Sequence, residues 1–380
     1  MERLSLGVVA TSLKPDERRL AIHPAHVERL DPHVRASMYL ERGYGERFGF
    51  ADAQLEPLVA GLRSRAELLA QSDVLVLAKP VPEDLRTLRP GQVVWGWPHC
   101  VQDPEMTQLA IDRGLTLIAW EAMNHWTDEG SFSVHVFHKN NEMAGYCSVL
   151  HAMELLGITG DYGRRLRAAV ISFGATARGA VTGLSALGVS DVTVLTQRSV
   201  SAVAAPFASV QMLNFARDPA EPSRTLALGP PEPGPLAGVL AEYDVVVNCM
   251  LQDTDEPLNF VINEDLPRFA PGTLFIDVSC DEGMGFEWAR PTSFADPMLA
   301  VGAGLSYYAV DHSPSFLWNS ATWEISEALL EYIPVVMAGP RAWDGSETIR
   351  RAIEIRDGEV LNPRILSFQG RASTAPYDVV

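Results

Sequence analysis

Five polar residues with complementary chemistry occur at or just after the ends of short apolar runs near the start of the chain. They are Arg18, Arg19, Lys79, His99 and Glu121. An arginine can hold a carboxylate through two parallel hydrogen bonds, while lysine and histidine can exchange protons at a carbonyl or an amine. Each residue alone also fits a surface or structural role. Together they predict a site where Arg18, Arg19 and Glu121 bind a substrate and where Lys79 and His99 are catalytic.

The apolar runs and the segments between them indicate how these residues are brought together. The runs are predicted to be strands: LSLGVVA (4–10), RASMYLE (35–41), DVLVLAK (73–79), QVVWGW (92–97) and LTLIAWE (115–121). Helical patterns separate several of the runs, and Asp103 and Pro104 suit the cap and first position of one helix. Strands that alternate with helices predict a mostly parallel sheet. The carboxyl ends of its strands form the edge where such sheets bind ligands, and we expect the five polar residues there.

A second series of the same kind begins near residue 167. Its predicted strands are LRAAVISFG, DVTVLTQ, YDVVVNCM and GTLFIDVSC, and a long helix over 138–160, ended by Gly157, precedes them. The Pro-rich segment LGPPEPGPLAG (228–238) is predicted to be a surface loop within the second series. The predicted fold class is therefore α/β, with two Rossmann-like domains that contain parallel sheets and a cleft between them.

The segment RAAVISFGATARG (167–179) has the pattern of a strand, a tight turn and a helix. In the fingerprint of a dinucleotide-binding turn, Ser172 replaces the first glycine, Gly174 is the second, and Ala177 stands at the third. Gly174 would let a pyrophosphate approach the backbone, and the helix N-terminus would offer free amides. The alternative is an ordinary connection between a strand and a helix. The predicted cofactor contacts of this turn are Ser172, Gly174, Ala175, Thr176 and Ala177.

The end of the next predicted strand bears on the choice of cofactor. A site for NAD calls for an acidic residue there, which hydrogen-bonds the ribose hydroxyls. The sequence has Thr196, Gln197, Arg198 and Ser199 instead, and Arg198 could pair with a 2′-phosphate. We therefore predict NADP (NADPH) as the cofactor, with NAD less favoured, and Gln197, Arg198 and Ser199 as contacts. The alternative for Arg198 is an ordinary exposed arginine.

A pair of acidic residues follows the last strand of the second series. Asp277 ends the strand and Asp281 comes shortly after it. A carboxylate at Asp281, on the face that looks across the expected cleft, could attract an amine and is predicted to be catalytic. The alternative is an acidic loop residue beside Gly283.

Composition excludes several classes of function. A chain of 380 residues suggests two domains, and its formal charge of −18 argues against nucleic acid or an anionic membrane as a partner. The four cysteines lack CxxC spacing, so neither a metal site nor disulfides are predicted. The sequence has no run of eighteen apolar residues and no signal-peptide pattern, so we expect a cytoplasmic protein.

Several segments, in order along the chain, resemble the alanine dehydrogenase and transhydrogenase family. The likeness is strongest to its opine-forming members of the carboxyethylornithine synthase type and weaker to saccharopine dehydrogenases. The segments are ERRLAIHP, ERGYGERFGFADAQ, LAKPVPED, GQVVWGWPH, HKNNEMAGYCSVLHAMELLG, GTLFIDVSCDEG and YYAVDHSPSFLWNSATWEIS. The likeness extends to about residue 330, and Asn319 stands where relatives often carry arginine.

The resemblance implies roles for the matched residues. Arg19 would hold the carboxylate of a keto acid, with Arg18 as a helper or a surface neighbour. Lys79 would contact the substrate oxygen or amine, His99 would exchange protons, and Asp281 would lie near the nicotinamide. The resemblance also implies a discontinuous substrate domain, residues 1–140 and 311–380, and a dinucleotide-binding domain, residues 141–310.

The expected activity is the NADP-dependent condensation of a pyruvate-like 2-keto acid with the amine of a basic amino acid, followed by reduction to a secondary amine. The amine donor would resemble ornithine or lysine, so the partners are small molecules, and a homo-oligomer is expected. One alternative is an amino-acid dehydrogenase of the alanine dehydrogenase type, and another is a saccharopine-type dehydrogenase. A non-catalytic NADP-binding regulator is a third alternative, of a different class.

Overall fold

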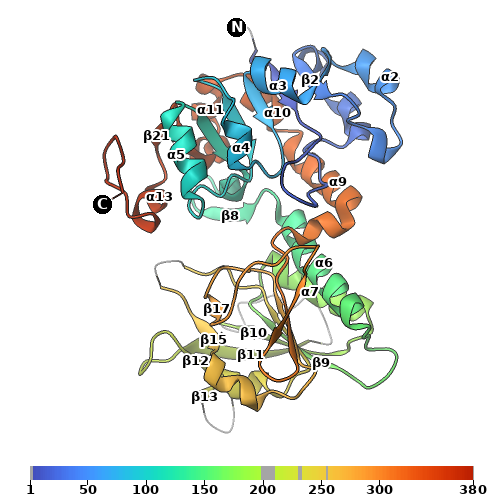
Figure 1. Cartoon of the computed structure of the whole chain (residues 1–380), viewed down its shortest axis with the longest axis vertical. Helices are drawn as coiled ribbons and strands as arrows, with labels where there is room; N and C mark the ends of the chain where they lie inside the picture. The colour runs from blue at the N-terminus through green and yellow to red at the C-terminus, as the bar shows by residue number, and fades with distance from the viewer. Residues whose placement is uncertain (1–2, 198–209, 230–232, 254–255, 380) are drawn as a thin grey trace. The chain divides into compact units, whose positions relative to one another are not determined.

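The computed structural model describes residues 3–197, 210–229, 233–253 and 256–379. The chain divides into two compact units (Figure 1), each with its own core. Unit 1 consists of Met1–Phe137 and Trp318–Val380, and unit 2 consists of His138–Leu317. In the part of the chain that is described, no helix is long and apolar enough to cross a membrane.

Unit 1 is built on an eight-stranded sheet with the strand order β21-β20-β6-β5-β4-β1-β2-β3. The strands β1 to β6 are parallel, whereas β20 pairs with β6 in the antiparallel direction. Their bounds are β1 Leu6–Val8, β2 Met38–Glu41, β3 Gly61–Arg63, β4 Val74–Val76, β5 Val93–Gly96, β6 Thr116–Ala119, β20 Ile353–Arg356 and β21 Glu359–Val360. A separate hairpin pairs β7 Asn124–Trp126 with β8 Phe132–His135.

The connections of unit 1 are mostly short helices. The predicted helix after Asp103 is confirmed, because the Asp103 side chain accepts a hydrogen bond from Met106 N at 2.9 Å and the helix begins at Pro104. The helices are α1 Pro32–Arg35, α2 Asp52–Leu55, α3 Arg65–Gln71, α4 Pro82–Leu85, α5 Pro104–Asp112, α9 Trp318–Leu329, α10 Ile333–Met337, α11 Pro340–Gly345, α12 Glu347–Ala352 and α13 Pro363–Phe368. The 3-10 turns are η1 Pro24–Arg29, η2 Glu46–Phe48, η3 Glu56–Leu58 and η4 Trp120–Ala122.

The order of the strands fixes where loops diverge in unit 1. β1 lies between β4 and β2, so the chain leaves β1 toward one side and returns to β4 on the other. At such a point the loops after the two strands part, and open α/β sheets bind ligands in the space between them. The loop after β1 carries Arg18 and Arg19, and the turn after β4 carries Lys79.

Unit 2 contains a nine-stranded sheet with the order β13-β12-β11-β10-β9-β14-β16-β19-β18. Its central strands are parallel, and antiparallel pairs lie at both ends of the sheet. The bounds are β9 Arg167–Ile171, β10 Asp191–Thr196, β11 Val210–Arg217, β12 Thr225–Ala227, β13 Gly234–Pro235, β14 Val245–Asn248, β16 Leu274–Asp277, β18 Met298–Val301 and β19 Leu305–Tyr308; β15 Asn259–Val261 pairs with β17 Gly285–Phe286. Two units with mostly parallel sheets confirm the predicted α/β, Rossmann-like fold class.

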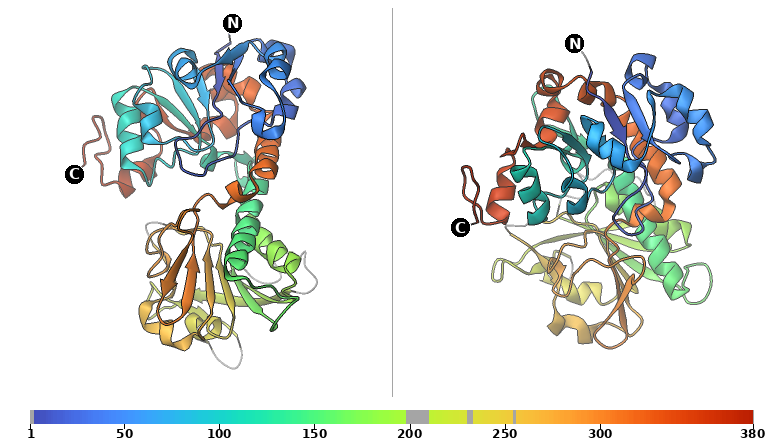
Figure 2. Two further views of the ribbon diagram at one scale, coloured as in Figure 1. Left: turned by 45° about the vertical axis from the view of Figure 1, so that its right-hand side comes forward. Right: turned by 45° about the horizontal axis from the view of Figure 1, so that its top comes forward.

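Two helices of unit 2 pack closely because glycines face the contact. α6 His138–Leu156 and α7 Ala175–Ala186 lie side by side (Figures 1 and 2). A Cβ atom at Gly145 would lie 1.9 Å from the Thr176 carbonyl oxygen, and one at Gly179 would lie 1.7 Å from the Glu142 carbonyl oxygen. Gly179, which follows the predicted phosphate turn, therefore serves the packing of the helices. The remaining helical segments of unit 2 are α8 Leu236–Leu240, η6 Asn263–Arg268 and η7 Ser313–Leu317.

One loop prediction is wrong. The Pro-rich segment 228–238 includes the strand β13 Gly234–Pro235 and the start of helix α8, while residues 230–232 lie outside the described part of the chain. Proline lacks a backbone donor, but it is tolerated in an edge strand and at the start of a helix. Because β13 is the edge of its sheet and Pro235 precedes α8, the prolines are compatible with both elements.

Candidate active site

Lys79 and His99 lie in contact at the carboxyl edge of the unit 1 sheet. Lys79 Nζ is 2.7 Å from His99 Nε2. Lys79 was expected to be the last residue of its strand, but β4 ends at Val76 and Lys79 stands in the turn that follows, just before a proline that cannot extend the strand pairing. A Cβ atom at Gly96 would lie 2.0 Å from the Leu77 carbonyl oxygen. The absence of a side chain at Gly96 thus lets the two strand ends approach.

Glu121 holds the backbone of His99. It lies in η4, directly after β6, rather than in the strand itself. Its Oε1 atom accepts a hydrogen bond from His99 N at 2.7 Å and lies 3.9 Å from His99 Nδ1. His99 has a φ of 49°, which an L residue rarely adopts without support. The carboxyl group of Glu121, which was predicted from the sequence to bind the substrate, is therefore directed at His99.

Arg19 forms a buried ion pair that sequence reasoning missed. Its Nε and Nη2 atoms donate to Glu17 Oε1 at 2.8 Å and to Oε2 at 2.5 Å, and both side chains are almost fully buried. The Arg19 guanidinium also lies 4.9 Å from the ring centre of Trp97, two residues before His99. Glu17 therefore sets the plane of the guanidinium beside the segment that carries His99. Arg18 is exposed, as expected for a helper or a surface neighbour.

The loop that carries this ion pair is anchored at both ends by the segment that follows β2. Glu41 accepts hydrogen bonds from Ala10 N at 2.7 Å, Thr11 N at 2.9 Å and Thr11 Oγ1 at 2.7 Å. The Tyr44 hydroxyl donates to the Ile22 carbonyl oxygen at 2.6 Å and accepts from Ile22 N at 3.1 Å. Buried Glu41 and Tyr44 thus hold the start and the end of the loop, which explains why the charged motif ERGYG contributes to the site.

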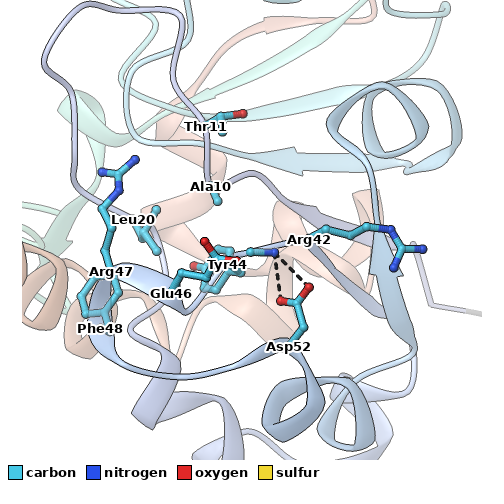
Figure 3. A pocket seen from close by; sticks show the side chains of 10 residues that line it. Ala10, Thr11, Leu20, Arg42, Tyr44, Glu46, Arg47, Phe48 and Asp52 are labelled. Atoms are coloured by element: carbon cyan, nitrogen blue, oxygen red, sulfur yellow. Dashed lines mark hydrogen bonds between the residues drawn. The ribbon is translucent and has the colours of Figure 1, made fainter.

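Two adjoining cavities lie beside this loop. The first, of about 360 Å³, is lined by the turn after β2, where Asp52 accepts hydrogen bonds from Gly43 N at 2.9 and 3.1 Å (Figure 3). The second, of about 540 Å³, shares Thr11 and Arg47 with the first. Its other lining residues are Ser12, Leu13, Lys14, Pro15, Asp16, Glu17, Arg18 and Trp318. Three cationic side chains, the acidic residues Asp16 and Glu17, and the Trp318 ring therefore line a space next to Arg19.

In unit 2, the predicted dinucleotide turn has the position in the sheet that is typical of such turns. It follows β9, which stands between β10 and β14, so the loops after β9 and β14 diverge. Gly174 precedes the first residue of α7, and a Cβ atom built on it would meet no described atom within 4 Å. Ala177 is completely buried against the core. Ala175 and Thr176 form the first turn of α7, whose amides are available to an anion.

The residues after β10 are only partly covered by the structure. Gln197 is exposed and directly follows the strand. Arg198 and Ser199 lie outside the described residues.

Ser172 adopts a left-handed backbone conformation, with a φ of 85°. Such a φ strains an L residue by about 1–2 kcal/mol, and glycine avoids this strain. We therefore expect Ser172→Gly to raise the free energy of unfolding by about 1 kcal/mol, as measured by chemical denaturation. Ser172→Ala serves as the control and should give no such gain, because alanine keeps the Cβ atom. A glycine variant no more stable than the alanine variant would contradict this account.

Asp277 and Asp281 have different environments. Asp277 is fully buried and accepts hydrogen bonds from Asn248 Nδ2 at 2.9 Å, the Tyr307 hydroxyl at 2.9 Å and Cys280 N at 3.1 Å. Burial raises the pKa of Asp277 to about 7. Burial also raises the pKa of Asp281, which follows in the next turn. Asp277 thus holds the turn that presents Asp281, a role that sequence reasoning did not assign to it.

Comparison with known proteins agrees with this architecture. Residues 7–144 match the family described as alanine dehydrogenase/PNT, N-terminal domain, and residues 220–363 match alanine dehydrogenase/PNT, C-terminal domain. An N(5)-(carboxyethyl)ornithine synthase of Clostridium botulinum is 24% identical over 334 residues, which cover 84% of this chain and 90% of the relative. An alanine dehydrogenase of Mycobacterium tuberculosis is 24% identical over 385 residues, which cover 98% of this chain and 99% of the relative.

A solved structure shares the fold. An L-alanine dehydrogenase superposes with a TM-score of 0.76 at 20% identity, over 96% of this chain and 99% of the other. Both domains of one family match in order, and together they cover most of the chain. The chain therefore belongs to the alanine dehydrogenase/PNT family and is an oxidoreductase that acts on amino groups with a nicotinamide cofactor.

Proposed function

We propose that this protein is an NADP-dependent opine-type oxidoreductase. In the proposed reaction a pyruvate-like 2-keto acid condenses with the side-chain amine of a basic amino acid such as ornithine or lysine, and the imine is reduced to a secondary amine. The observation that carries the proposal is the 2.7 Å contact between Lys79 Nζ and His99 Nε2. Such a pair can supply both the acid and the base that condensation requires.

Each step of the proposed reaction gives a task to residues of the chain. Arg19 holds the keto-acid carboxylate while the neutral amine adds to the carbonyl carbon, and the resulting carbinolamine loses its hydroxyl group as water. One member of the Lys79–His99 pair accepts the proton that the ammonium group gives up, and the other protonates the departing hydroxyl. The charge of Asp281 favours the iminium ion. The nicotinamide cofactor, when bound, supplies the hydride that reduces the carbon atom of this iminium ion.

The cavity beside the Arg19 loop suits the second substrate. A basic amino acid carries its own carboxylate, and Lys14, Arg18 and Arg47 line the same space. Arginine binds carboxylates in a bidentate manner, and the Trp318 ring offers an apolar surface to the methylene chain. A free amine without a carboxylate would lack these contacts. We therefore propose that the amine donor is an amino acid rather than a simple alkylamine.

An amino-acid dehydrogenase that uses ammonia is the second candidate, because relatives named alanine dehydrogenase match almost the whole chain. The test mixes the protein with NADPH and pyruvate and adds ornithine, lysine, an alkylamine or ammonia, while absorbance follows NADPH oxidation. Oxidation that requires ornithine or lysine supports the proposal. Oxidation with ammonia alone supports the second candidate. The absence of oxidation with every amine contradicts both and leaves an NADP-binding protein without turnover.

Cofactor preference follows from the residues after β10. No acidic residue stands at positions 196–199, and Arg198 is available for a 2′-phosphate. We expect higher kcat/KM with NADPH than with NADH, and a loss of about ten- to a hundredfold for NADPH alone in Arg198→Ala, since a charged hydrogen bond contributes about 1.5–3 kcal/mol. Steady-state kinetics with both cofactors test this. Equal use of NADH and NADPH by the unmodified protein would contradict the assignment.

Keto-acid binding is assigned to Arg19 rather than to Arg18. Arg19→Lys keeps the positive charge but loses the planar fork, so the KM for the keto acid should rise about tenfold or more. Exposed Arg18→Lys is the matched control and should change this KM little. Circular dichroism checks that both variants are folded, because Arg19→Lys also alters the buried ion pair with Glu17. A larger rise in KM for Arg18→Lys than for Arg19→Lys would reverse the assignment.

A further inference from the structure

The backbone of His99 needs support from its surroundings. Its φ of 49° lies in the left-handed region, where an L residue is strained by about 1–2 kcal/mol. Residues in such conformations persist where the neighbouring structure holds them, and they are frequent at functional sites. The His99 carbonyl oxygen accepts hydrogen bonds from Gln102 N at 3.1 Å and Asp103 N at 3.0 Å, which closes a turn over 99–103. Contacts that fix this turn therefore also fix the direction of the His99 ring.

A glutamine near the end of the chain holds this turn. Gln369 directly follows helix α13, and its Nε2 atom donates a hydrogen bond to the Cys100 carbonyl oxygen at 2.7 Å. The Val101 carbonyl oxygen and Thr107 Oγ1 each lie 3.2 Å from the same nitrogen. Thr107 Oγ1 also donates to the Cys100 carbonyl oxygen at 2.8 Å. Two side chains thus fix the carbonyl group of the residue that follows His99.

Arg371 determines which end of the Gln369 amide faces the turn. Its Nε atom donates to Gln369 Oε1 at 2.6 Å. Because a guanidinium can only donate, the amide oxygen must face Arg371 and the amide nitrogen must face the turn. Arg371 is 8% exposed, and its other nitrogens donate to Gln108 Oε1 at 2.7 Å, the Tyr377 carbonyl oxygen at 3.2 Å and the Pro104 carbonyl oxygen at 3.3 Å. With an acceptor for each nitrogen, the guanidinium is held in one orientation.

The segment that carries both residues is anchored in the core of unit 1. Ile365 of α13 is fully buried and Tyr377 is 7% exposed, and both belong to the same apolar cluster as Met106 of α5. Gln369 therefore reaches the His99 turn from a fixed support. The sequence motifs end near residue 330, so they assign no role to this segment.

We propose that Gln369 is a positioning residue for His99: its amide holds the turn after His99, and Arg371 keeps the amide in the orientation that does so. His99 Nε2 must stay near Lys79 Nζ, at 2.7 Å, for the two groups to exchange a proton, and a displacement of about 1 Å can cost about a hundredfold in rate. The inference deepens the proposed function, because it rests on His99 as a proton-handling residue. Its first test needs no turnover, so its failure can be distinguished from that of the proposed function.

The first test is the nuclear magnetic resonance spectrum of protein labelled with ¹⁵N-histidine, in which the His99 ring signals are assigned by their loss in His99→Gln. Gln369→Glu keeps an oxygen for Arg371, but an ionised carboxylate cannot donate to the Cys100 carbonyl oxygen. We expect the ring-nitrogen signals of His99 to shift, because the contact of Nε2 with Lys79 is loosened. Gln369→Ala removes the amide without adding a charge and should shift the same signals.

Controls separate the lost hydrogen bond from the added charge. Gln102→Glu places the same charge on an exposed residue of the turn itself and should leave the His99 signals in place. Thermal unfolding verifies that each variant is folded, and Gln369→Ala carries the test if Gln369→Glu does not fold. Unchanged His99 signals in the folded Gln369 variants overturn the proposal. A shift in Gln102→Glu together with none in Gln369→Ala also overturns it, because charge alone would then explain the effect.

The second test applies where the unmodified protein oxidises NADPH. Gln369→Glu should lower kcat about ten- to a hundredfold, while the KM values for keto acid and NADPH change by less than about twofold, because Arg19 and unit 2 are untouched. A loss of stability alone would not produce this split. An unchanged kcat overturns the positioning role. If the unmodified protein turns over with no amine, the proposed function fails, and the His99 signals alone decide the role of Gln369.

Discussion

Lys79→Met and His99→Gln should each lower kcat by about a hundred- to ten-thousandfold, which is the usual contribution of general acid–base catalysis. Condensation needs a base to free the amine and an acid to release water, and the contact between Lys79 Nζ and His99 Nε2 at 2.7 Å lets one pair serve both needs. Neither substitution lies in unit 2. NADPH binding, followed by fluorescence, should therefore stay near that of the unmodified protein while steady-state turnover falls.

The double variant distinguishes a working pair from two separate contributors. Groups that act as a unit are not additive, so the double variant should be little slower than the slower single variant. Exposed Lys139→Met and His33→Gln are matched controls and should turn over normally. Near-normal kcat in either Lys79→Met or His99→Gln would remove that residue from the mechanism.

We expect the unmodified protein to lose stability as the pH rises toward 7. Asp277→Asn should abolish this loss. The pKa of Asp277 is raised by burial from an ordinary value of 3.8 to about 7. The folded state therefore holds a proton that the unfolded state releases between these values, and this contribution is present at low pH and is lost as the pH rises through about 7. The loss amounts to a few kcal/mol, since each pH unit corresponds to about 1.4 kcal/mol.

The measurement is the free energy of unfolding by urea at a series of pH values from 5 to 8. The asparagine amide preserves an acceptor for Asn248 and Cys280 N and can donate to the Tyr307 hydroxyl, so the variant should fold and gain in relative stability toward pH 8. Exposed Asp296→Asn is the control and should follow the unmodified protein. Parallel curves for Asp277→Asn and the unmodified protein would show that Asp277 is already ionised in the folded state.

Much of the secondary structure could be predicted because it depends on local patterns. The helix after Asp103 begins where the cap and Pro104 indicate, and α6 ends at Leu156, just before Gly157. Short apolar runs mark the strands, although β4 and β6 end earlier than the runs do. The parallel sheets follow from the alternation of these elements, and so does the expectation that Lys79, His99 and Glu121 meet at one edge.

The contacts that define the site depend on distant parts of the chain. Glu17 pairs with Arg19, and the one signal for this pair was the position of Glu17 two residues before the arginine. Glu121 meets His99 through the pairing of β5 with β6. The antiparallel strand β20 joins the edge of β6 from the C-terminal segment, and no pattern in the sequence links the two strands.

The interruption of unit 1 by unit 2 has a consequence for biosynthesis. Unit 2 is one continuous segment, His138–Leu317, whereas unit 1 needs residues from both sides of it. Domains fold as units while the ribosome still adds residues, so unit 2 can close before the sheet of unit 1 is complete. Until β20 emerges, the edge of β6 that pairs with it stays open. The part of unit 1 that is made first therefore keeps an unpaired strand edge until the segment that follows unit 2 has been synthesised.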